Sequence, residues 1–208
     1  MKNTPQIARL TLIVIGVLAG NALQAQQDLS GLWFPAGAPG GGQEPRETPF
    51  NDFGRQLFDN YVKVFAIDDD PGGWCVSPGL PRSIWGAPFP VEIVQTESFI
   101  NMFWEGYFQY RKIYLDGYPR PEPILNTGMG YSVGHWEGDT LVVETSYLRE
   151  YPYMRRLPNT DTATTIERIT TEERTNAKGE TRRYLKNELT LTDPRLYTQP
   201  VKITGSLA

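Results

Sequence analysis

The sequence predicts a mainly β protein whose strands form an antiparallel meander closed into a barrel, preceded by a short helix and a long aromatic loop. Three observations lead to this fold class. After residue 90, runs rich in Val, Ile, Tyr, Phe and Thr are separated by turn residues. The runs number about eight and most are joined by short turns, which is typical of barrels and sandwiches. Apolar and polar residues also alternate within several runs, as they do in a wall with one buried face.

The first 25 residues have the layout of a secretory signal peptide. Lys2 and Arg9 form a positive region, Leu10–Ala19 is apolar and uncharged, and small residues lead to a predicted cleavage after Ala25 or Ala22. The apolar run has about half the length that a bilayer span needs, so we expect no permanent membrane anchor. The protein is therefore predicted to be exported, to the periplasm or to the medium.

The charge of the remaining chain argues against a nucleic-acid partner. The whole chain has a net charge of −4, and removal of the two basic residues of the signal leaves −6. Polyanions are bound by basic patches, whereas the pairs Arg155-Arg156 and Arg182-Arg183 are isolated. Residues 26–208 have the length of one domain, which is long enough to bury a core without metals or disulfides.

Residues 26–90 are predicted to join that domain as a strand, a Gly/Pro-rich loop, a short helix and an aromatic loop. Asp28–Trp33 reads as a strand, and the Gly- and Pro-rich stretch after it reads as a surface loop. Apolar residues recur at roughly helical spacing in Asn51–Phe65, which predicts an amphipathic helix capped by Asn51 or Asp52. The loop Asp68–Pro90 carries two tryptophans, so we expect it to pack over another part of the molecule.

Residues 91–208 are predicted to form the barrel itself. Its predicted turns are Glu105-Gly106, Asp116-Gly117, Glu137-Gly138-Asp139 and Asn176–Gly179. In the run Arg183–Thr192, alternation predicts an inward face that consists of Leu185, Asn187, Leu189 and Leu191. In Thr164–Thr175, Ile166 and Ile169 break the alternation, which indicates a β-bulge.

Cysteine and histidine are too scarce for the usual metal sites. Cys75 is the only cysteine, and we expect a buried thiol that packs as a small apolar side chain; an intermolecular disulfide is the alternative. His135 is the only histidine, and zinc or copper sites usually need several imidazole or thiolate ligands. The sequence also lacks a phosphate loop and a dinucleotide fingerprint, so neither a metal nor another cofactor is expected.

Two resemblances agree with this fold class. Gly31-Leu32-Trp33 resembles the Gly-x-Trp of the lipocalins, in which the Trp closes one end of an eight-stranded barrel. Four further motifs resemble those of an abundant, largely uncharacterised group of exported bacterial β-proteins. The motifs are a Cys-x-Pro-x-Gly-x-Pro-Arg-like loop, an EIVQT strand, an RxIYLDGR strand and an SxGxWEGDTLVVxT hairpin. They match Cys75 with Ser77–Arg82, Glu92–Thr96, Arg111–Gly117 and Ser132–Thr145.

The resemblance to the exported group covers about two-thirds of the chain after the signal. It implies export and a β fold, but it names no substrate. Tyr118 stands where the relatives have Arg. The relatives continue past a DPxxYTxPW-like segment to a second cysteine, whereas this sequence has Asp193–Pro200 and then reaches Ala208. This difference puts the final strand, and any disulfide from Cys75, in doubt.

The hairpin Gly130–Leu148 holds the first candidate catalytic residues. Its acidic turn residues Glu137 and Asp139 are interpreted as turn chemistry that fixes the strand register. His135 is a candidate because histidine is the side chain type that exchanges protons near neutral pH, although a histidine beside a turn is also commonly a surface residue. Glu144 lies in an apolar strand, so it either faces solvent or is a buried carboxylate whose raised pKa would suit acid–base catalysis.

A second cluster lies one hairpin earlier in the chain. Glu105 is the third candidate acid or base, although its place in a turn also explains it. Tyr110 and Arg111 lie on opposite faces of a strand. An inward Arg111 would bind a carboxylate, either of a ligand or of Glu92 or Glu144.

The aromatic residues complete the candidate ligand-binding set. The set consists of Tyr110, Arg111, Trp104, Tyr131 and Trp136, with core packing as the alternative role for the aromatic members. The first functional hypothesis is a β-barrel that holds a small apolar or aromatic molecule, whose polar end Arg111 or Tyr110 fixes. The second is a cofactor-free isomerase or lyase in which His135, Glu144 or Glu105 moves a proton on such a molecule. A structural or partner-binding module is the third.

Overall fold

The computed structural model describes residues 26–36, 47–85, 89–115, 125–155 and 157–208. The predicted signal peptide, most of the Gly/Pro-rich loop and the Asp116-Gly117 turn lie outside these residues. The helical elements are α1 (Asp52–Val64), η1 (Pro71–Trp74), α2 (Arg82–Trp85) and η2 (Gly106–Phe108). The strands are β1 (Gly31–Trp33), β2 (Val91–Gln95), β3 (Phe99–Trp104), β4 (Gln109–Leu115), β5 (Tyr131–Glu137), β6 (Thr140–Ser146), β7 (Thr164–Thr175), β8 (Thr181–Thr192) and β9 (Val201–Leu207).

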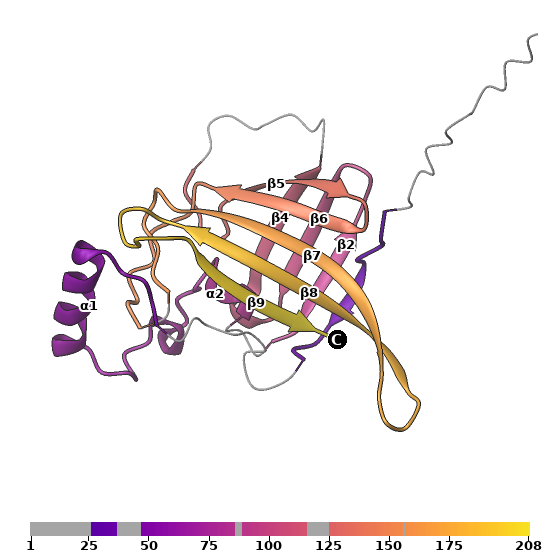
Figure 1. Cartoon of the computed structure of the whole chain (residues 1–208), viewed down its shortest axis with the longest axis horizontal. Coiled ribbons are helices and arrows are strands. Elements are labelled where there is room, and N and C mark those ends of the chain that lie inside the picture. Colours follow the sequence, from indigo (N-terminus) through magenta and orange to yellow (C-terminus); the bar gives the residue numbers. More distant parts are fainter. Residues whose placement is uncertain (1–25, 37–46, 86–88, 116–124, 156) are drawn as a thin grey trace, which may run out of the picture.

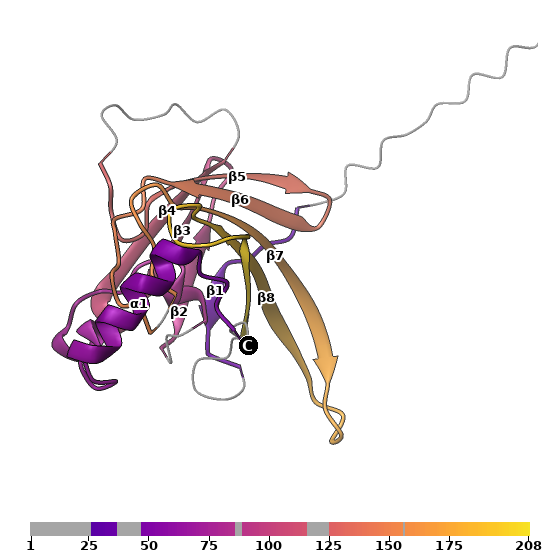
Figure 2. The ribbon, with the colours of Figure 1, turned by 60° about the vertical axis from the view of Figure 1, so that its left-hand side comes forward.

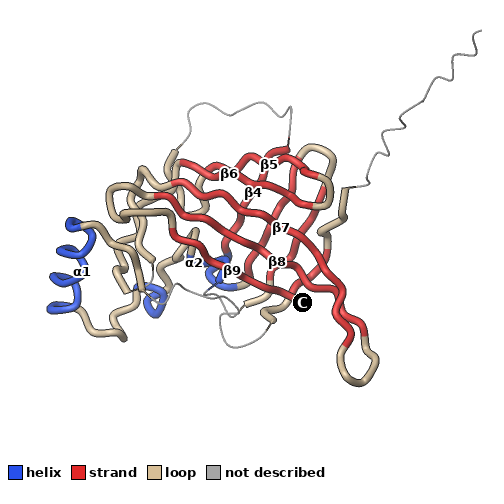
Figure 3. Tube along the Cα trace, viewed as in Figure 1, coloured by secondary structure: helices blue, strands red, loops and turns tan. Residues whose placement is uncertain are grey.

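The nine strands form one sheet in chain order, which confirms the predicted mainly β fold (Figures 1 and 3). Every neighbouring pair is antiparallel except β4 and β5, which run parallel. The predicted meander was wrong at this point. A parallel pair needs a crossover of about a dozen residues or more, and the Pro-rich connection from Leu115 to Tyr131 is long enough to supply one.

The sheet curls into a nearly closed barrel (Figures 1 and 2). Its two ends meet where the chain continues past β1 and runs beside β9. The backbones of Phe34 and Ala208 exchange two hydrogen bonds, of 2.8 and 2.7 Å, and the amide of Ala36 donates to the carbonyl of Ser206 at 3.1 Å. The resemblance to the exported group had put the final strand in doubt. In the structure β9 pairs with β8 along its whole length, and the residues at its end take part in closing the barrel.

Alternate residues of the strands fill the barrel. The predicted inward face of β8 is confirmed, because Leu185, Asn187, Leu189 and Leu191 are all buried. The predicted bulge in β7 was wrong: its register with β8 is continuous from Thr164 to Thr175. Ile166 is an outward residue with 48% of its surface exposed, so an exposed apolar side chain, and not an inserted residue, broke the sequence pattern.

Helix α1 lies beside one end of the barrel (Figures 1 and 2). Its predicted cap is confirmed, because the side chain of Asn51 accepts a hydrogen bond from the Gly54 amide at 2.8 Å. Gly54 is the buried residue of this helix, and a methyl group there would collide with the carbonyl oxygen of Leu196. The missing side chain therefore lets the first turn of α1 approach the 193–198 segment closely.

The aromatic loop differs from its prediction at two positions. Cys75 is exposed, and it follows η1 with a left-handed backbone (φ 61°), so the expectation of a buried thiol was wrong. Trp74 is also exposed, because η1 lies on the surface. Among the helices of the described ranges, none is both long and apolar enough to cross a bilayer.

Candidate ligand groove

Arg111 of β4 is buried inside the barrel, whereas its neighbour Tyr110 is exposed on the outer face. Its guanidinium forms a two-point ion pair with Glu167 of β7, and the Nη1–Oε1 distance is 3.1 Å. Nε donates to Ser132 at 2.9 Å, and Nη2 donates to Thr145 at 2.8 Å. Asn187 donates to the same carboxylate at 2.7 Å. These contacts tie β4, β5, β6, β7 and β8 together through one buried charge pair.

The expected partner of Arg111 was therefore wrong. Glu92 and Glu144 are both exposed on the outer face of the wall, whereas Glu167 is fully buried. The burial of Glu167 could not be recognised from the sequence, because this residue lies in a run rich in Thr and charged residues that reads as a solvated strand. Because the guanidinium of Arg111 is paired with the carboxylate of Glu167, Arg111 has a structural role and is not free to bind a ligand.

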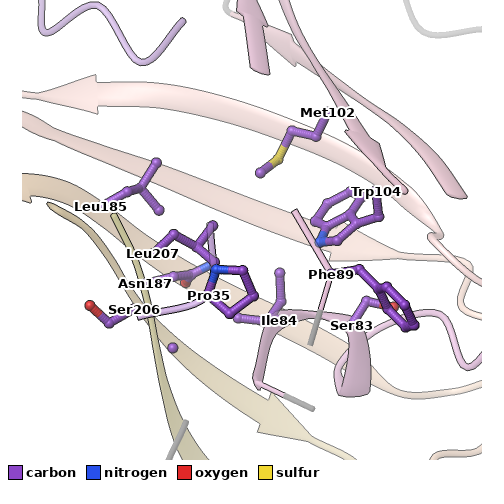
Figure 4. Close-up of a pocket in the computed structure, with 11 residues that line it drawn as sticks. Pro35, Ser83, Ile84, Phe89, Met102, Trp104, Leu185, Asn187, Ser206 and Leu207 are labelled. Atoms are coloured by element: carbon purple, nitrogen blue, oxygen red, sulfur yellow. The ribbon is translucent and has the colours of Figure 1, made fainter. Parts of the chain in front are cut away.

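One cavity reaches into the barrel, and it is small. Between α2 and the strands β3, β8 and β9, the interior contains a cavity of about 20 Å³ (Figure 4). Trp104, Met102, Leu185, Asn187 and Ile84 are among the residues that line it. A cavity of that size holds about one water molecule, whereas small-molecule sites enclose roughly 300–1,000 Å³. This cavity, which Trp104 lines, is therefore too small for such a ligand.

The three candidate acid–base residues do not meet. Glu105 is exposed in the turn before η2. His135 and Glu144 share the outer face of the β5–β6 hairpin, where His135 lies opposite Val142 and Glu144 lies opposite Val133. The imidazole Nε2 is 3.4 Å from Glu137, whose pKa is held below its usual value by a hydrogen bond from Arg168 and by His135. The exposed ion pair between Glu137 and Arg168 thus connects the hairpin turn to β7.

The remaining candidates are spread over both faces of the wall. Tyr110 is exposed and its hydroxyl donates to Asn101 at 2.7 Å, while Trp136 is partly buried against the core. Tyr131 and Glu144 line an open concavity on the outside of β5, β6 and β7, of about 470 Å³. His135 is not among its lining residues, and its walls are largely Thr, Ser and Glu. The structure thus brings two predicted residues together on an open outer surface, which also carries the exposed apolar side chains of Val133 and Ile166.

A second open site lies between α1 and the loop after β6. This groove measures about 370 Å³. Its helical wall consists of Phe53, Leu57, Asn60, Tyr61 and Phe65, and its other wall consists of Glu150, Tyr151, Pro152, Met154, Pro158, Asn159, Thr160, Arg195 and Leu196. We call this site the α1 groove. Its size is within the range of small-molecule sites, and its walls are mainly apolar and aromatic.

The amino-terminal end of α1 is attached to the segment that follows β8. Asn51 makes three of these contacts: its backbone amide donates to the carbonyl of Leu196 at 2.9 Å, and its Nδ2 donates to the carbonyls of Pro194 and Arg195, both at 3.1 Å. Phe50 stacks on Tyr197, with ring centroids 5.5 Å apart. These contacts hold the first turn of the helix firmly.

The carboxyl-terminal end of α1 is attached to the other wall of the groove. Arg155 donates to the carbonyl of Phe65 at 2.9 Å, and Tyr153 donates to the carbonyl of Ile67 at 2.9 Å. Tyr61 meets the edge of Tyr153, with ring centroids 6.0 Å apart. Both ends of α1 are therefore attached to the rest of the protein, and the helix between them forms one wall of the groove.

The apolar stripe of α1 faces this groove but is not covered. Phe53, Leu57, Tyr61 and Phe65 are spaced four residues apart and so share one face of the helix. Phe53, Leu57 and Phe65 remain 50%, 38% and 43% exposed. The spacing of these residues in the sequence predicted the amphipathic helix, but it did not show what the apolar stripe faces. The partner segment around residue 150 has no periodic pattern, so only the structure could show the groove.

A polar cluster supports the groove from behind. Arg82 donates to Asp70 at 2.7 Å and to the Tyr151 hydroxyl at 2.7 Å, and its guanidinium lies 5.5 Å from the centre of the Tyr153 ring. Burial raises the pKa of Tyr151 to about 12. Burial also raises the pKa of Tyr61. Like ordinary phenols, both are neutral at physiological pH, so the lining is uncharged at these two positions.

Comparisons with models of known protein families and with curated proteins found no match. The described residues also hold no group of three or more His, Cys, Asp or Glu side chains that could bind a metal ion. The geometry of the α1 groove is therefore the main evidence for a function.

Proposed function

We propose that this is an exported β-barrel protein that binds a small apolar or aromatic molecule, and that the α1 groove is the binding site. The observation that carries the proposal is the uncovered apolar stripe of α1 over a cavity of about 370 Å³. Burial of apolar surface is worth about 25 cal/mol per Å², so an occupant that covers these side chains gains free energy from each of them. Exposed apolar patches of this kind commonly mark ligand or partner sites.

The attachment of α1 at both ends supports a pre-formed site. A groove that already exists before binding does not need to be opened, so less of the interaction energy is lost to ordering. The aromatic rings of Tyr61, Phe65 and Tyr151 add flat surfaces against which an aromatic ligand can pack.

A thermal-shift screen with neutral aromatic compounds, steroids and fatty acids tests the proposal. A ligand at one hundred times its Kd stabilises the native state by about 2.7 kcal/mol, which raises Tm by several degrees. We expect such shifts for apolar and aromatic compounds. No shift with any member of the panel at its solubility limit would contradict the proposal.

Two neighbouring substitutions locate the site. Leu57→Glu places a charge in the apolar stripe and is expected to abolish the ligand-induced shift. Gln56→Glu adds the same charge one residue earlier, at an exposed position that does not line the groove, and should leave the shift unchanged. Equal shifts in the two variants would exclude the α1 groove as the site.

We also propose that the chain is exported through cleavage after Ala25. The basic, apolar and small-residue regions of residues 1–25 support this proposal, as does the resemblance to exported bacterial β-proteins. Mass spectrometry of the protein expressed with its full sequence in a bacterial host should find an amino terminus at Gln26 in the periplasm or medium. An intact Met1 terminus in the cytoplasm would refute this part of the proposal.

A further inference from the structure

Two charged side chains line the described part of the α1 groove, and they differ in their partners. Nη1 of Arg195 lies 3.0 Å from Asp161, so this cation is paired. Glu150 is exposed, and within the described part of the chain its carboxylate has no hydrogen-bond or ion-pair partner. The paired arginine contributes no net charge, so Glu150 leaves the groove with an excess of negative charge.

Aromatic rings lie in the same groove, at the carboxyl-terminal end of α1. Tyr61 and Phe65 stack, with ring centroids 4.5 Å apart, and both line the groove. Neither ring is buried. The face of an aromatic ring is electrically negative and attracts a cation that lies within about 6 Å of the ring centroid. The stacked pair therefore offers a surface on which an alkylated ammonium group can pack.

Acidic residues near these rings make the local potential more negative. Burial is the main cause of the raised pKa of Tyr61, and the neighbouring phenol of Tyr153 is the second cause. The carboxylates of Asp69 and Asp70 raise this pKa further, whereas Arg155 lowers it. Asp69 alone acts more strongly on Tyr61 than Arg155 does. A positive charge beside Tyr61 is therefore favoured over a negative one.

We infer that the preferred ligand of the α1 groove is an organic cation, whose apolar or aromatic body packs on the stripe of α1 while its alkylated ammonium group lies against Tyr61 and Phe65, near the carboxylate of Glu150. Charge complementarity supports this class of ligand. An anion of the same size would meet an unpaired carboxylate and a guanidinium that is already engaged. The inference rests on the proposed function and narrows it from apolar or aromatic molecules in general to positively charged ones.

Calorimetric titration with three compounds of similar size tests the inference. Benzyltrimethylammonium carries the positive charge, neopentylbenzene replaces its nitrogen with carbon, and hydrocinnamate carries a negative charge. We expect the cation to bind about fivefold more tightly than neopentylbenzene, because a cation–π contact and an exposed charge pair each contribute modestly. Hydrocinnamate should bind most weakly. Equal or tighter binding of neopentylbenzene would overturn the inference and leave the proposed function standing, whereas a failure of all three to bind would count against the proposed function itself.

The dependence on salt shows whether charge causes the preference. Raising the salt from about 0.1 M to about 1 M shortens the screening length from about 10 Å to about 3 Å. The advantage of benzyltrimethylammonium over neopentylbenzene should therefore shrink. An advantage that stays constant over this range would contradict charge complementarity.

Two variants connect the preference to Glu150. Glu150→Gln removes the charge at an exposed position and keeps the shape of the side chain, so it should lower the affinity for benzyltrimethylammonium about threefold. Glu144→Gln changes the net charge equally at an exposed position on β6 that does not line the groove, and it should leave this affinity unchanged. Equal affinities of the two variants would show that Glu150 has no special role and would overturn the inference.

Discussion

Arg111 and Glu167 form a buried, two-point ion pair inside the barrel, with at most 1% of either side chain exposed. The two residues come from β4 and β7, which are not neighbours in the sheet. The pair therefore connects opposite parts of the wall across the core. Ser132, Thr145 and Asn187 complete it with hydrogen bonds. A register slip of one residue in any of these strands would move its partner to the solvent face and leave a buried charge unpaired.

Removal of one member of this pair should destabilise the protein strongly. Arg111→Met and Glu167→Gln each leave a buried charge without its partner, which typically costs about 3–5 kcal/mol. The combined change Arg111→Met with Glu167→Leu removes both charges and should recover much of that loss. Urea denaturation measures the free energy of unfolding of all three variants. Additive losses in the double variant would contradict a coupled pair.

A neighbouring substitution serves as the control. Arg168→Met, one position along β7, breaks the exposed pair with Glu137, in which about half of each side chain is accessible. Exposed pairs contribute little, so the free energy of unfolding should hardly change. A loss comparable to that of Glu167→Gln would mean that general damage to β7, and not the buried pair, explains the effect.

Gly54→Ala should weaken the packing of α1 against the 193–198 segment. Alanine favours a helix over glycine by about 1 kcal/mol, so helix propensity alone predicts stabilisation. The added methyl would instead collide with the Leu196 carbonyl, and a collision with backbone commonly costs about 1–3 kcal/mol. We expect lower stability and faster hydrogen exchange of the α1 amides.

Gly73→Ala is the matched control for that variant, because a methyl group there would meet nothing within 4 Å. Its stability should stay close to that of the parent protein. If Gly54→Ala were the more stable of the two, the close contact between α1 and the 193–198 segment would not exist in solution.

The folded protein should lose stability in alkali through Tyr151. Burial raises the pKa of this phenol from 10.0 to about 12, so the folded state holds its proton more tightly than the unfolded chain does. Its contribution is fully present below pH 10 and is lost as the pH rises through 12. Tyr151→Phe should therefore flatten the fall in stability between these pH values, measured by denaturation at a series of pH values. An unchanged slope would show that Tyr151 is not responsible.

The fold could be predicted from local patterns of the sequence. Alternation in β8 identified the inward side chains correctly, and Asn51 marked the start of α1. Both depend on residues that are close together in the chain. The parallel pairing of β4 with β5 could not be predicted, because it depends on how the Pro-rich connection after Leu115 returns to the sheet.

The candidate site was harder to predict for the same reason. Alternation placed Tyr110 and Arg111 on opposite faces but did not decide which one is inward, and the partner of Arg111 lies 56 residues away along the chain in a strand that looks solvated. The stripe of α1 was visible, whereas the wall opposite it is irregular chain around Tyr151 and Asn159. Their contact is set by the packing of loops, which leaves no periodic signal in the sequence.

Mapping of bound benzyltrimethylammonium by two-dimensional ¹H–¹⁵N NMR tests the central claim most directly. With this compound, the largest shifts of backbone amides should fall on α1 and on residues 150–160, around Leu57 and Asn159. Shifts centred on the barrel interior at Met102 and Trp104, or on the outer wall at Val133 and Ile166, would contradict the α1 groove as the binding site.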